Sequence, residues 1–504
     1  MKKNYLADNS KPFAKVCNNS FGRTVLYTNE DVIDESNILQ DFNKRLSTHN
    51  QNATEIDYLY NYYCGDQPVL YRVKNIRPEI NNQIVQNIAY YIVETKASDI
   101  AGEPIQYVLR GTEERKSQEI ADLNDLMDAE DKAYYDISLA RWRSICGTSF
   151  RYVGNDTHKQ SLDESEFYLN VYDPRDTAVV YYSDDTTAYS FKRGKDKDGK
   201  NIYTLYTDSQ WFKVTGNKIV DSGLNGFRGN PIIEYPNNEN RLSDIEITIS
   251  ISDAINDMAS NRQDGIAQFV QSFVKFVNCE MDADKFAQLR SSGAFIVKSN
   301  NGDNKADVDI MSSELNQTES QVAMDDLFNK LLIIQGLASR SSDAGLNTTK
   351  GAVELRNGHY DSEKRAELSE PSFKRAEKKF LRIILNRLRV IKGSSLVLSD
   401  VEVKISRSKM DNMLTKAETL QMLLACGINS ERAIKSVGFF ADPEIVAIES
   451  KARMDILYPT KEETSVEEVT NVNAENGYDT QTTETTRTVL RSDESVGGGN
   501  EKKD

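Results

Sequence analysis

Residues 243–273 read SDIEITISISDAINDMASNRQDGIAQFVQSF, and the fold is organised around this stretch. Its first part alternates isoleucine with polar residues, which is typical of a strand, but beyond residue 252 the apolar residues recur at helical spacing. Ser243 is a suitable N-cap, and Asp244 and Glu246 favour the positive end of a helix dipole. We therefore expect one helix from about residue 243. Its isoleucines lie on two faces, which fits a helix packed between neighbouring subunits.

Four carboxylates share one side of this expected helix. Glu246, Asp253, Asp257 and Asp264 are spaced by seven, four and seven residues, so they project in similar directions. On a lone monomer such a row is most simply a solvated helix face. In a ring of subunits the same row becomes a carboxylate-lined passage.

A second helix is expected to return beside the first. Residues 313–335 place Leu315, Val322, Leu327, Leu331, Leu332 and Ile334 on an inward face. Residues 274–312 between the helices read as a small strand-helix-strand insert. Residues 336–349 (GLASRSSDAGLNTT) form a small-residue loop at the other end, with glycines that suit mobility. The sequence thus predicts a helical hairpin with an insert at one end and a loop at the other.

Composition excludes several classes of protein. The chain has 504 residues, a net charge of -16, 38% hydrophobic and 28% charged residues, and five scattered cysteines. That length predicts two or three domains. A strongly acidic chain is not a general nucleic-acid binder, because binding depends on Lys and Arg displacing counterions. The cysteine spacing indicates neither a zinc site nor a disulfide framework. We find no signal peptide and no membrane-spanning run, so we expect a soluble protein made in a cytoplasm.

The region before the hairpin changes period along its length. Helical spacing predicts helices over residues 34–49, 81–101 and 117–145, and the period of two over residues 147–236 predicts an antiparallel meander. The Tyr-rich stretch at residues 58–63 suits base stacking, but aromatics covering a helix end is the preferred reading. Residues 194–201 (GKDKDGKN) are close to the sequence motif of a phosphate-binding loop. Asn201 stands where a hydroxyl is needed and the flanks are strand-like, so we expect a charged hairpin tip.

Beyond the loop, residues 372–392 form a basic amphipathic helix. Its Lys374, Lys378 and Arg382 suit contact with DNA, pairing with an acidic neighbouring chain, or simple solvation, and the last two are preferred. Residues 396–405 alternate as a strand, and short helices follow up to residue 454. From residue 459 the hydrophobic content collapses, which predicts a disordered acidic tail.

No catalytic constellation is present in the sequence. His49, His158 and His359 stand far apart, without metal-site spacing. Asp184-Asp185 and Asp325-Asp326 are adjacent pairs whose members point in different directions. A metal-dependent nuclease built from carboxylates that meet only in the fold is an alternative without specific support.

Ordered segments across residues 50–455 resemble bacteriophage portal proteins, of the type found in long-tailed phages of Gram-positive hosts. Each segment is a weak signal, and their order around a helix-insert-helix is specific. The segments are YYCGDQP at 62–68, residues 82–96, GEP at 102–104, YDP at 172–174, PIIEYPNNE at 231–239, TKGAVEL at 349–355, GINSERA at 427–433 and DPEIVAIESKAR at 442–453. Pro371 departs from the family pattern, because it interrupts what is usually one long helix, so a kink or break is expected there.

The resemblance implies an α+β, predominantly helical portal-type subunit without enzymatic activity or cofactor. The expected parts are a wing-like region (1–240), stem helix 1 (241–273), a clip-like insert (274–312), stem helix 2 (313–335), a tunnel loop (336–349), wing-return helices and strand (350–406), a helical crown (407–458) and the tail (459–504). It also implies a closed ring of about twelve copies.

The implied function is the DNA channel at one vertex of a capsid. The genome is packaged through such a ring by the terminase large subunit and later ejected, and a head-completion adaptor docks on it. Scaffold and major capsid protein are further implied partners, in a virion assembled in the host bacterial cytoplasm, without a membrane. Another head-tail connector or a minor capsid protein is the alternative within the same class.

Two sets of site residues follow from this resemblance. The expected channel residues are the four carboxylates together with Ser339, Arg340, Ser341 and Asp343 of the loop, where Arg340 is the base expected to meet the DNA backbone. Acidic walls suit a channel, because they surround the duplex without binding its phosphates. The expected docking residues of the insert are Lys275, Phe276, Asn300, Asn301 and Asp303.

Overall fold

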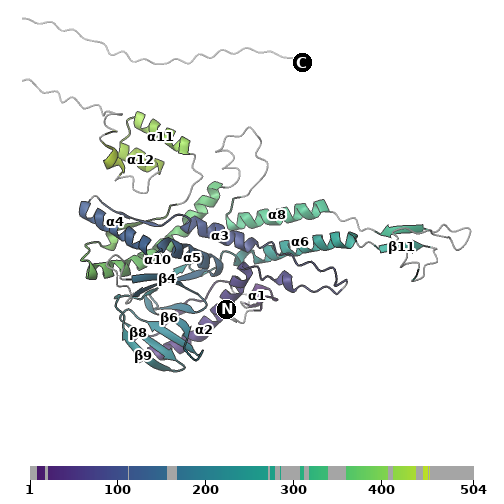
Figure 1. Ribbon diagram of the computed structural model, residues 1–504, viewed down its shortest axis with the longest axis horizontal. Helices are drawn as coiled ribbons and strands as arrows, with labels where there is room; N and C mark the ends of the chain where they lie inside the picture. The colour runs from purple at the N-terminus through teal and green to yellow at the C-terminus, as the bar shows by residue number, and fades with distance from the viewer. Residues whose placement is uncertain are drawn as a thin grey trace, which may run out of the picture.

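A computed structural model of the chain gives its architecture (Figure 1). The residues described are 8–16, 21–75, 77–111, 113–155, 167–270, 273–277, 284, 307–311, 317–338, 359–406, 413–438, 446–451 and 453. The acidic tail predicted from residue 459 lies outside them. Within these ranges, no helix has the length and apolar character that crossing a bilayer demands.

The larger sheet has six strands in the order β1-β5-β6-β7-β8-β9. Strands β5 to β9 form an antiparallel meander, and β1 is added parallel to β5. The single meander predicted over residues 147–236 is therefore confirmed in part, because residues 148–155, 167–172 and 232–236 lie in a second sheet. The turn between β6 and β7 carries the sequence similar to a phosphate-binding loop, and Lys195 pairs with Asn201 across it. This confirms the charged hairpin tip. The strands are β1 Leu26–Tyr27, β5 Thr177–Tyr181, β6 Thr187–Lys195, β7 Asn201–Tyr206, β8 Gln210–Thr215 and β9 Lys218–Leu224.

Helix α2 (Ile38–Tyr63) packs its first turns on this sheet, where the rings of Phe42 and Phe191 lie 5.1 Å apart. The helix is longer than the predicted 34–49 and runs through the Tyr-rich stretch. Tyr58 and Tyr62 are fully buried there. The preferred reading of these tyrosines, as packing residues at a helix end, is therefore confirmed.

A second sheet has the order β10-β3-β4 and is antiparallel throughout. Its strands share the largest hydrophobic core with α4, α5 and α10. A short pair, β13 with β2, closes the same core. The bounds are β2 Gln106–Leu109, β3 Thr148–Asn155, β4 Phe167–Tyr172, β10 Ile232–Pro236 and β13 Val401–Lys404.

Two of the predicted helices differ from the structure. The helix predicted over 117–145 is two helices, α4 (Glu114–Ala129) and α5 (Lys132–Cys146), because Asp131 between them takes a left-handed φ of 51°. The helix predicted over 81–101 begins later, as α3 (Ile88–Ala101). It follows Asn87, whose φ of 46° is also left-handed, and the residues from 81 to 87 are not helical.

The central hairpin projects from the body of the chain (Figure 1). A 3-10 turn (Glu246–Thr248) leads into α6 (Ile249–Val270), and α8 (Gln317–Gln335) returns beside it. Between them β11 (Phe273–Val277) pairs with β12 (Asp307–Met311). We call α6, β11, β12 and α8 the stem hairpin. The two helices lie side by side as predicted, although the first α-helical turn begins at Ile249 rather than near residue 243.

Helix α10 (His359–Ile391) runs through Pro371 without a break. Of the kink or break expected at this proline, the break is therefore wrong, while the kink stays a prediction. The helix is held along its length by buried apolar residues from Phe373 to Leu388, and this packing outweighs the hydrogen bond that proline cannot donate. The other helices are α1 Phe13–Val16, α11 Met413–Ala425 and α12 Ser430–Val437, with 3-10 turns η1 Pro68–Tyr71 and η3 Leu398–Asp400.

A buried ion cluster fixes α10 to the second sheet. The Glu377 carboxylate lies 2.8 Å from the Lys132 ammonium and accepts a hydrogen bond of 2.7 Å from the Tyr235 hydroxyl. Asp136 pairs with both Lys132 and Arg151. Burial opposes ionisation of Glu377, but Lys132 and Arg151 hold the pKa of its carboxyl well below the ordinary value. The two acids and two bases balance, so each charge in this cluster has a partner.

Replacing Glu377→Ala should lower the free energy of unfolding by about 3–5 kcal/mol, because it leaves buried cations without their counter-charge. Denaturant unfolding would measure the loss. The control is Glu370→Ala on the same helix, whose partly exposed pair with Lys374 should cost less than about 1 kcal/mol. Equal losses in the two variants would contradict the role assigned to the cluster.

Candidate functional site at the base of the stem hairpin

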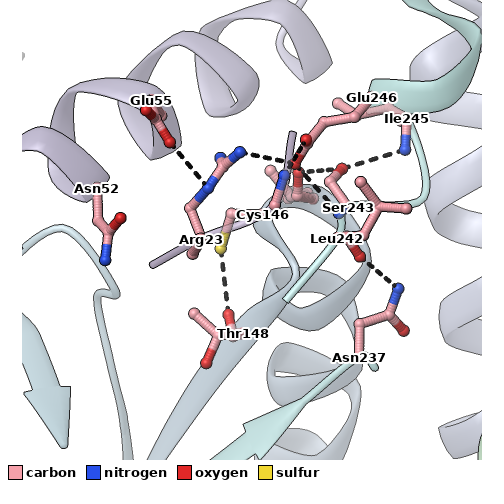
Figure 2. Close-up of polar contacts among 12 residues, drawn as sticks. Arg23, Asn52, Glu55, Cys146, Thr148, Asn237, Leu242, Ser243, Ile245 and Glu246 are labelled. Carbon is pink, nitrogen blue, oxygen red and sulfur yellow. Dashed lines mark hydrogen bonds and ion pairs between the residues drawn. The ribbon is translucent and has the colours of Figure 1, made fainter. Parts of the chain in front are cut away.

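The entry to the stem hairpin is anchored by a buried carboxylate (Figure 2). Glu246 is 3% exposed. Its carboxylate lies 2.9 Å from the guanidinium of Arg23 and accepts backbone N–H bonds from Gly22 at 2.8 Å and Ser243 at 3.1 Å. Arg23 also lies 3.1 Å from the Glu55 carboxylate of α2. Two acids therefore share one arginine, and burial raises the pKa of both Glu55 and Glu246.

Two glycines allow the chain to pass closely at this point. A Cβ on Gly22 would lie 2.3 Å from the Asn240 carbonyl oxygen, and one on Gly147 would lie 1.9 Å from that of Arg241. Both glycines have left-handed φ, of 81° and 86°. Any side chain at either position would push the segment before α6 away from the body.

An extended segment, residues 82–86, runs along α6 and is held by its side chains. The backbone N–H groups of residues 82, 84 and 86 donate to Asp264 at 2.7 Å, Ser260 at 3.0 Å and Asn256 at 2.9 Å. The spacings match, since four helical residues advance about 6 Å and two extended residues about 6.6 Å. We call residues 82–86 the strap.

Asp264 carries most of the charge at this contact. It is 4% exposed and pairs with both Arg72 and Lys74, which precede the strap. Burial opposes its ionisation, but Lys74 and Asn82 outweigh that effect and lower the pKa of Asp264. The face of α6 that carries Asp264 is therefore covered by this chain itself.

The remaining two carboxylates of α6 differ from each other. Asp253 is half-buried and accepts a hydrogen bond of 2.9 Å from the Tyr62 hydroxyl, and burial raises its pKa to about 6. Asp257, one turn further along, is exposed. Among the four acidic positions that the sequence singled out, Asp257 is the one open to solvent.

The end of α8 at the base of the stem hairpin is also held by hydrogen bonds. The side-chain amide of Gln335 donates to the carbonyl oxygen of Asp244 and, at 2.9 Å, to the Thr248 hydroxyl. Lys96 donates to the Gln335 carbonyl at 2.7 Å. Arg365 of α10 donates to the carbonyls of residues 333 and 334 at 2.8 and 3.1 Å, at the end of α8, where the residue 333 carbonyl also accepts from the Gly336 N–H. The hairpin therefore leaves the body from a rigid base.

Comparison with known proteins identifies the architecture. The family model described as "Phage portal protein, SPP1 Gp6-like" matches residues 43–476, which include the strap and both stem helices. The chain belongs to this portal protein family. Portal proteins of this family are structural and not enzymes, as the sequence predicted. The predicted fold class, a mainly helical α+β portal-type subunit, is likewise confirmed.

Solved structures with some similarity include particles of a gene transfer agent (GTA). "Virion of native gene transfer agent (GTA) particle" is 12% identical, with a TM-score of 0.42 over 79% of this chain and 93% of that one. "Neck of native GTA particle computed with C12 symmetry" is 10% identical, with a TM-score of 0.42 over 70% and 89%. "Neck of empty GTA particle computed with C6 symmetry" is 10% identical, with a TM-score of 0.40 over 73% and 89%. Among curated proteins, none matches the sequence.

Two of the predicted channel residues of this portal protein are wrong. Glu246 and Asp264 cannot line a passage, because each is buried and paired within its own chain. A helical wheel reports which residues share a side but not what covers that side. Arg23, Arg72 and Lys74, which cover it, were missed. The signal that could have revealed them is the four-residue spacing of Asn256, Ser260 and Asp264.

The inward face predicted for the second stem helix is right in part. Leu331 and Leu332 are buried, and Leu327 packs partly against the same core. Val322 is 63% and Ile334 45% exposed, so these two do not face α6. The stem hairpin thus presents apolar side chains on its outer side.

The other predicted site residues are only partly placed. Lys275 and Phe276 lie in β11, where they pair with Asp309 and Val308 of β12. Ser339, Arg340, Ser341 and Asp343 of the loop, and Asn300, Asn301 and Asp303 of the insert, lie outside the described residues. Among the residues the structure does describe, no group of three or more His, Cys, Asp or Glu side chains could hold a metal ion.

Replacing Asp264→Ala should lower the free energy of unfolding by about 2–3 kcal/mol, because Arg72, Lys74 and the Asn82 N–H lose a charged acceptor. Asp257→Ala, on the exposed side of the same helix, is the matched control and should change stability by less than about 0.5 kcal/mol. Limited proteolysis should cut the strap faster only in the Asp264 variant. A strap equally protected in both variants would show that Asp264 does not hold it.

Stability should also depend on pH through Asp253. Its pKa is raised from 3.8 to about 6, so the folded chain binds a proton more tightly than the unfolded one. That stabilisation is complete below pH 3.8 and is lost as the pH rises to about 6. Asp253→Asn keeps an acceptor for Tyr62, so its stability relative to wild type should increase between pH 4.5 and pH 7, by at most about 3 kcal/mol. Thermal unfolding at several pH values tests this, and a difference independent of pH would contradict it.

Proposed function

We propose that this portal protein is the subunit of a closed ring of about twelve copies that forms the DNA channel at one capsid vertex. The stem hairpin carries the proposal: two helices clamped at their base, projecting from the body and ending in a small paired-strand unit (Figure 1). Membership of the portal family supports a role in connecting head and tail. In the ring, the stem hairpins of the subunits lie side by side around the central axis.

The proposed path of the genome follows from this arrangement. Double-stranded DNA is packaged through the ring by the terminase large subunit and leaves by the same route at ejection. The β11–β12 end of the hairpin, with Lys275 and Phe276, is the proposed docking site for the motor and then for the head-completion adaptor. Assembly with scaffold and major capsid protein occurs in the cytoplasm of the bacterial host, for which a Gram-positive cell stays a prediction.

The exposed charge of the stem hairpin suits a passage that does not hold DNA. Asp257 of α6 and Asp325 and Asp326 of α8 are exposed acids, and Lys330 is the exposed base that pairs with Asp326. A carboxylate repels phosphate, whereas each basic contact would add salt-dependent affinity. Asp257 is the acid on α6 that we assign to the channel wall, and Arg340 of the loop is the base proposed to meet the backbone.

Replacing Asp257→Lys should leave the ring intact but reduce packaging severely, because each ring then gains a circle of about twelve cations facing the duplex. Particle imaging down the axis would report the ring, and the DNA content of mutant heads would report packaging. Lys330→Glu, which makes an exposed site of α8 more acidic, is the control and should package normally. Intact rings with a normal DNA content in the Asp257 variant would refute its assignment to the wall.

The ring itself has a simpler test. Native mass measurement of the purified chain at micromolar concentration should give a closed oligomer with a central hole in images. A stable monomer under those conditions would count against the portal ring and favour another head-tail connector or a minor capsid protein.

A further inference from the structure

The exposed side of α10 is basic along its second half. Arg375, Lys378 and Arg382 follow one another at intervals of three and four residues, so they form a row on one side of the helix, and all three are exposed. Among the described residues none of the three has an ion-pair partner. In a chain with a net charge of -16, such a row suits pairing with acidic side chains of another chain.

Two exposed apolar side chains flank this row. Leu368 is 80% exposed and lies close to the direction of Arg375 on the helical wheel, whereas Val390, 67% exposed, lies about 60° from it on the side away from Lys378. A phosphate backbone offers nothing to a leucine or a valine, whereas a protein surface buries them. The composition of this side of α10 therefore favours a protein partner with an acidic centre over DNA.

The same chain carries a matching acidic surface on α4. Asp122, Asp125 and Asp128 are exposed, and among the described residues none has an ion-pair partner. They span about 9 Å of helix, against about 10.5 Å for the three bases of α10. Tyr134, just beyond the end of α4, is 70% exposed and offers apolar area beside the acids.

The two surfaces lie on two different helices of the same core. Helix α4 packs on β2 and α5, while α10 packs on β10 and β13, and both contribute to one core. A ring is built from heterologous contacts, in which one surface of a subunit meets a different surface of the next. Complementary charge on two separate surfaces of one chain is the pattern that such a contact needs.

We infer that the acidic side of α4 docks on the basic side of α10 of a second copy of this chain. The inference rests on the proposed ring and names a contact that orders its subunits. Opposite charge steers the encounter and rejects the wrong pairing, and the flanking Leu368, Val390 and Tyr134 are buried when the surfaces meet.

Charge reversal tests the contact with two triple variants. In the first, Arg375→Glu, Lys378→Glu and Arg382→Glu make both surfaces acidic; in the second, Asp122→Lys, Asp125→Lys and Asp128→Lys make both basic. Each variant alone should need about tenfold more protein to assemble, because like charges then face each other. A mixture of the two should assemble again as alternating subunits, and so should one chain that carries all six changes.

The control reverses three exposed lysines at the tips of the β6–β7 and β8–β9 hairpins, Lys197→Glu, Lys200→Glu and Lys218→Glu, and should assemble like wild type. Native mass measurement and imaging report assembly, and thermal unfolding confirms that each variant is folded. Unaltered rings in both triple variants, or no rescue on mixing, would overturn the inference while wild-type rings preserve the proposed function. Unaltered rings with weakened DNA retention in the α10 variant would assign the row to DNA instead, and a monomeric wild type would remove the ring itself.

Discussion

The backbone hydrogen bonds of the strap are the constraint on which the stem hairpin depends. An extended segment beside a helix has N–H groups that no sheet satisfies, and a buried N–H without an acceptor is costly. Helix α6 supplies the acceptors from Asn256, Ser260 and Asp264, one per turn. This arrangement fixes the rotation of α6 about its axis, because only one side carries these acceptors. Once that rotation is fixed, α8 and the exposed Asp257 have defined positions as well.

The periodicity of the sequence predicted the elements that pack by a continuous apolar pattern. The meander of β5 to β9, the stem helices and the Tyr-rich end of α2 are of this kind, and the structure confirms them. The periodicity predicted the structure less well where the conformation of a single residue, or a contact with a distant part of the chain, determines it. Asp131, with its left-handed φ, separates two helices where one was expected. Asn87, also left-handed, precedes the start of α3, so the residues before it form the strap and not the expected helix. Pro371 was expected to kink or break α10, yet the core beneath the helix keeps it unbroken. A local sequence rule gives the free-energy cost of placing a residue in a helix. Only the tertiary packing shows whether other contacts offset that cost.

The candidate site was harder to predict than the fold, for a related reason. Four acids at helical spacing looked alike in the sequence, but they have three different environments. Glu246 and Asp264 are buried with cations that lie 190 residues or more away in the chain, Asp253 is half-buried against Tyr62, and Asp257 is exposed. Within the helix, the four-residue spacing of Asn256, Ser260 and Asp264 is the signal that sets one of them apart. The difference comes from Arg23, Arg72 and Lys74, whose approach depends on the fold of the whole N-terminal region.

The buried and the exposed acids of this row have different roles, and this changes how many acidic residues a channel needs in its sequence. The carboxylates at the base of the stem hairpin are paired with cations of the same chain. They therefore contribute little net charge to the surface around them. An acid that faces a passage needs no partner in its own subunit, since in the proposed ring symmetry repeats it around the axis. A single exposed position such as Asp257 then gives a complete circle of negative charge. A row of acids along the whole helix is therefore unnecessary for a channel, and most of the acidic row on α6 is explained by the folding of one subunit.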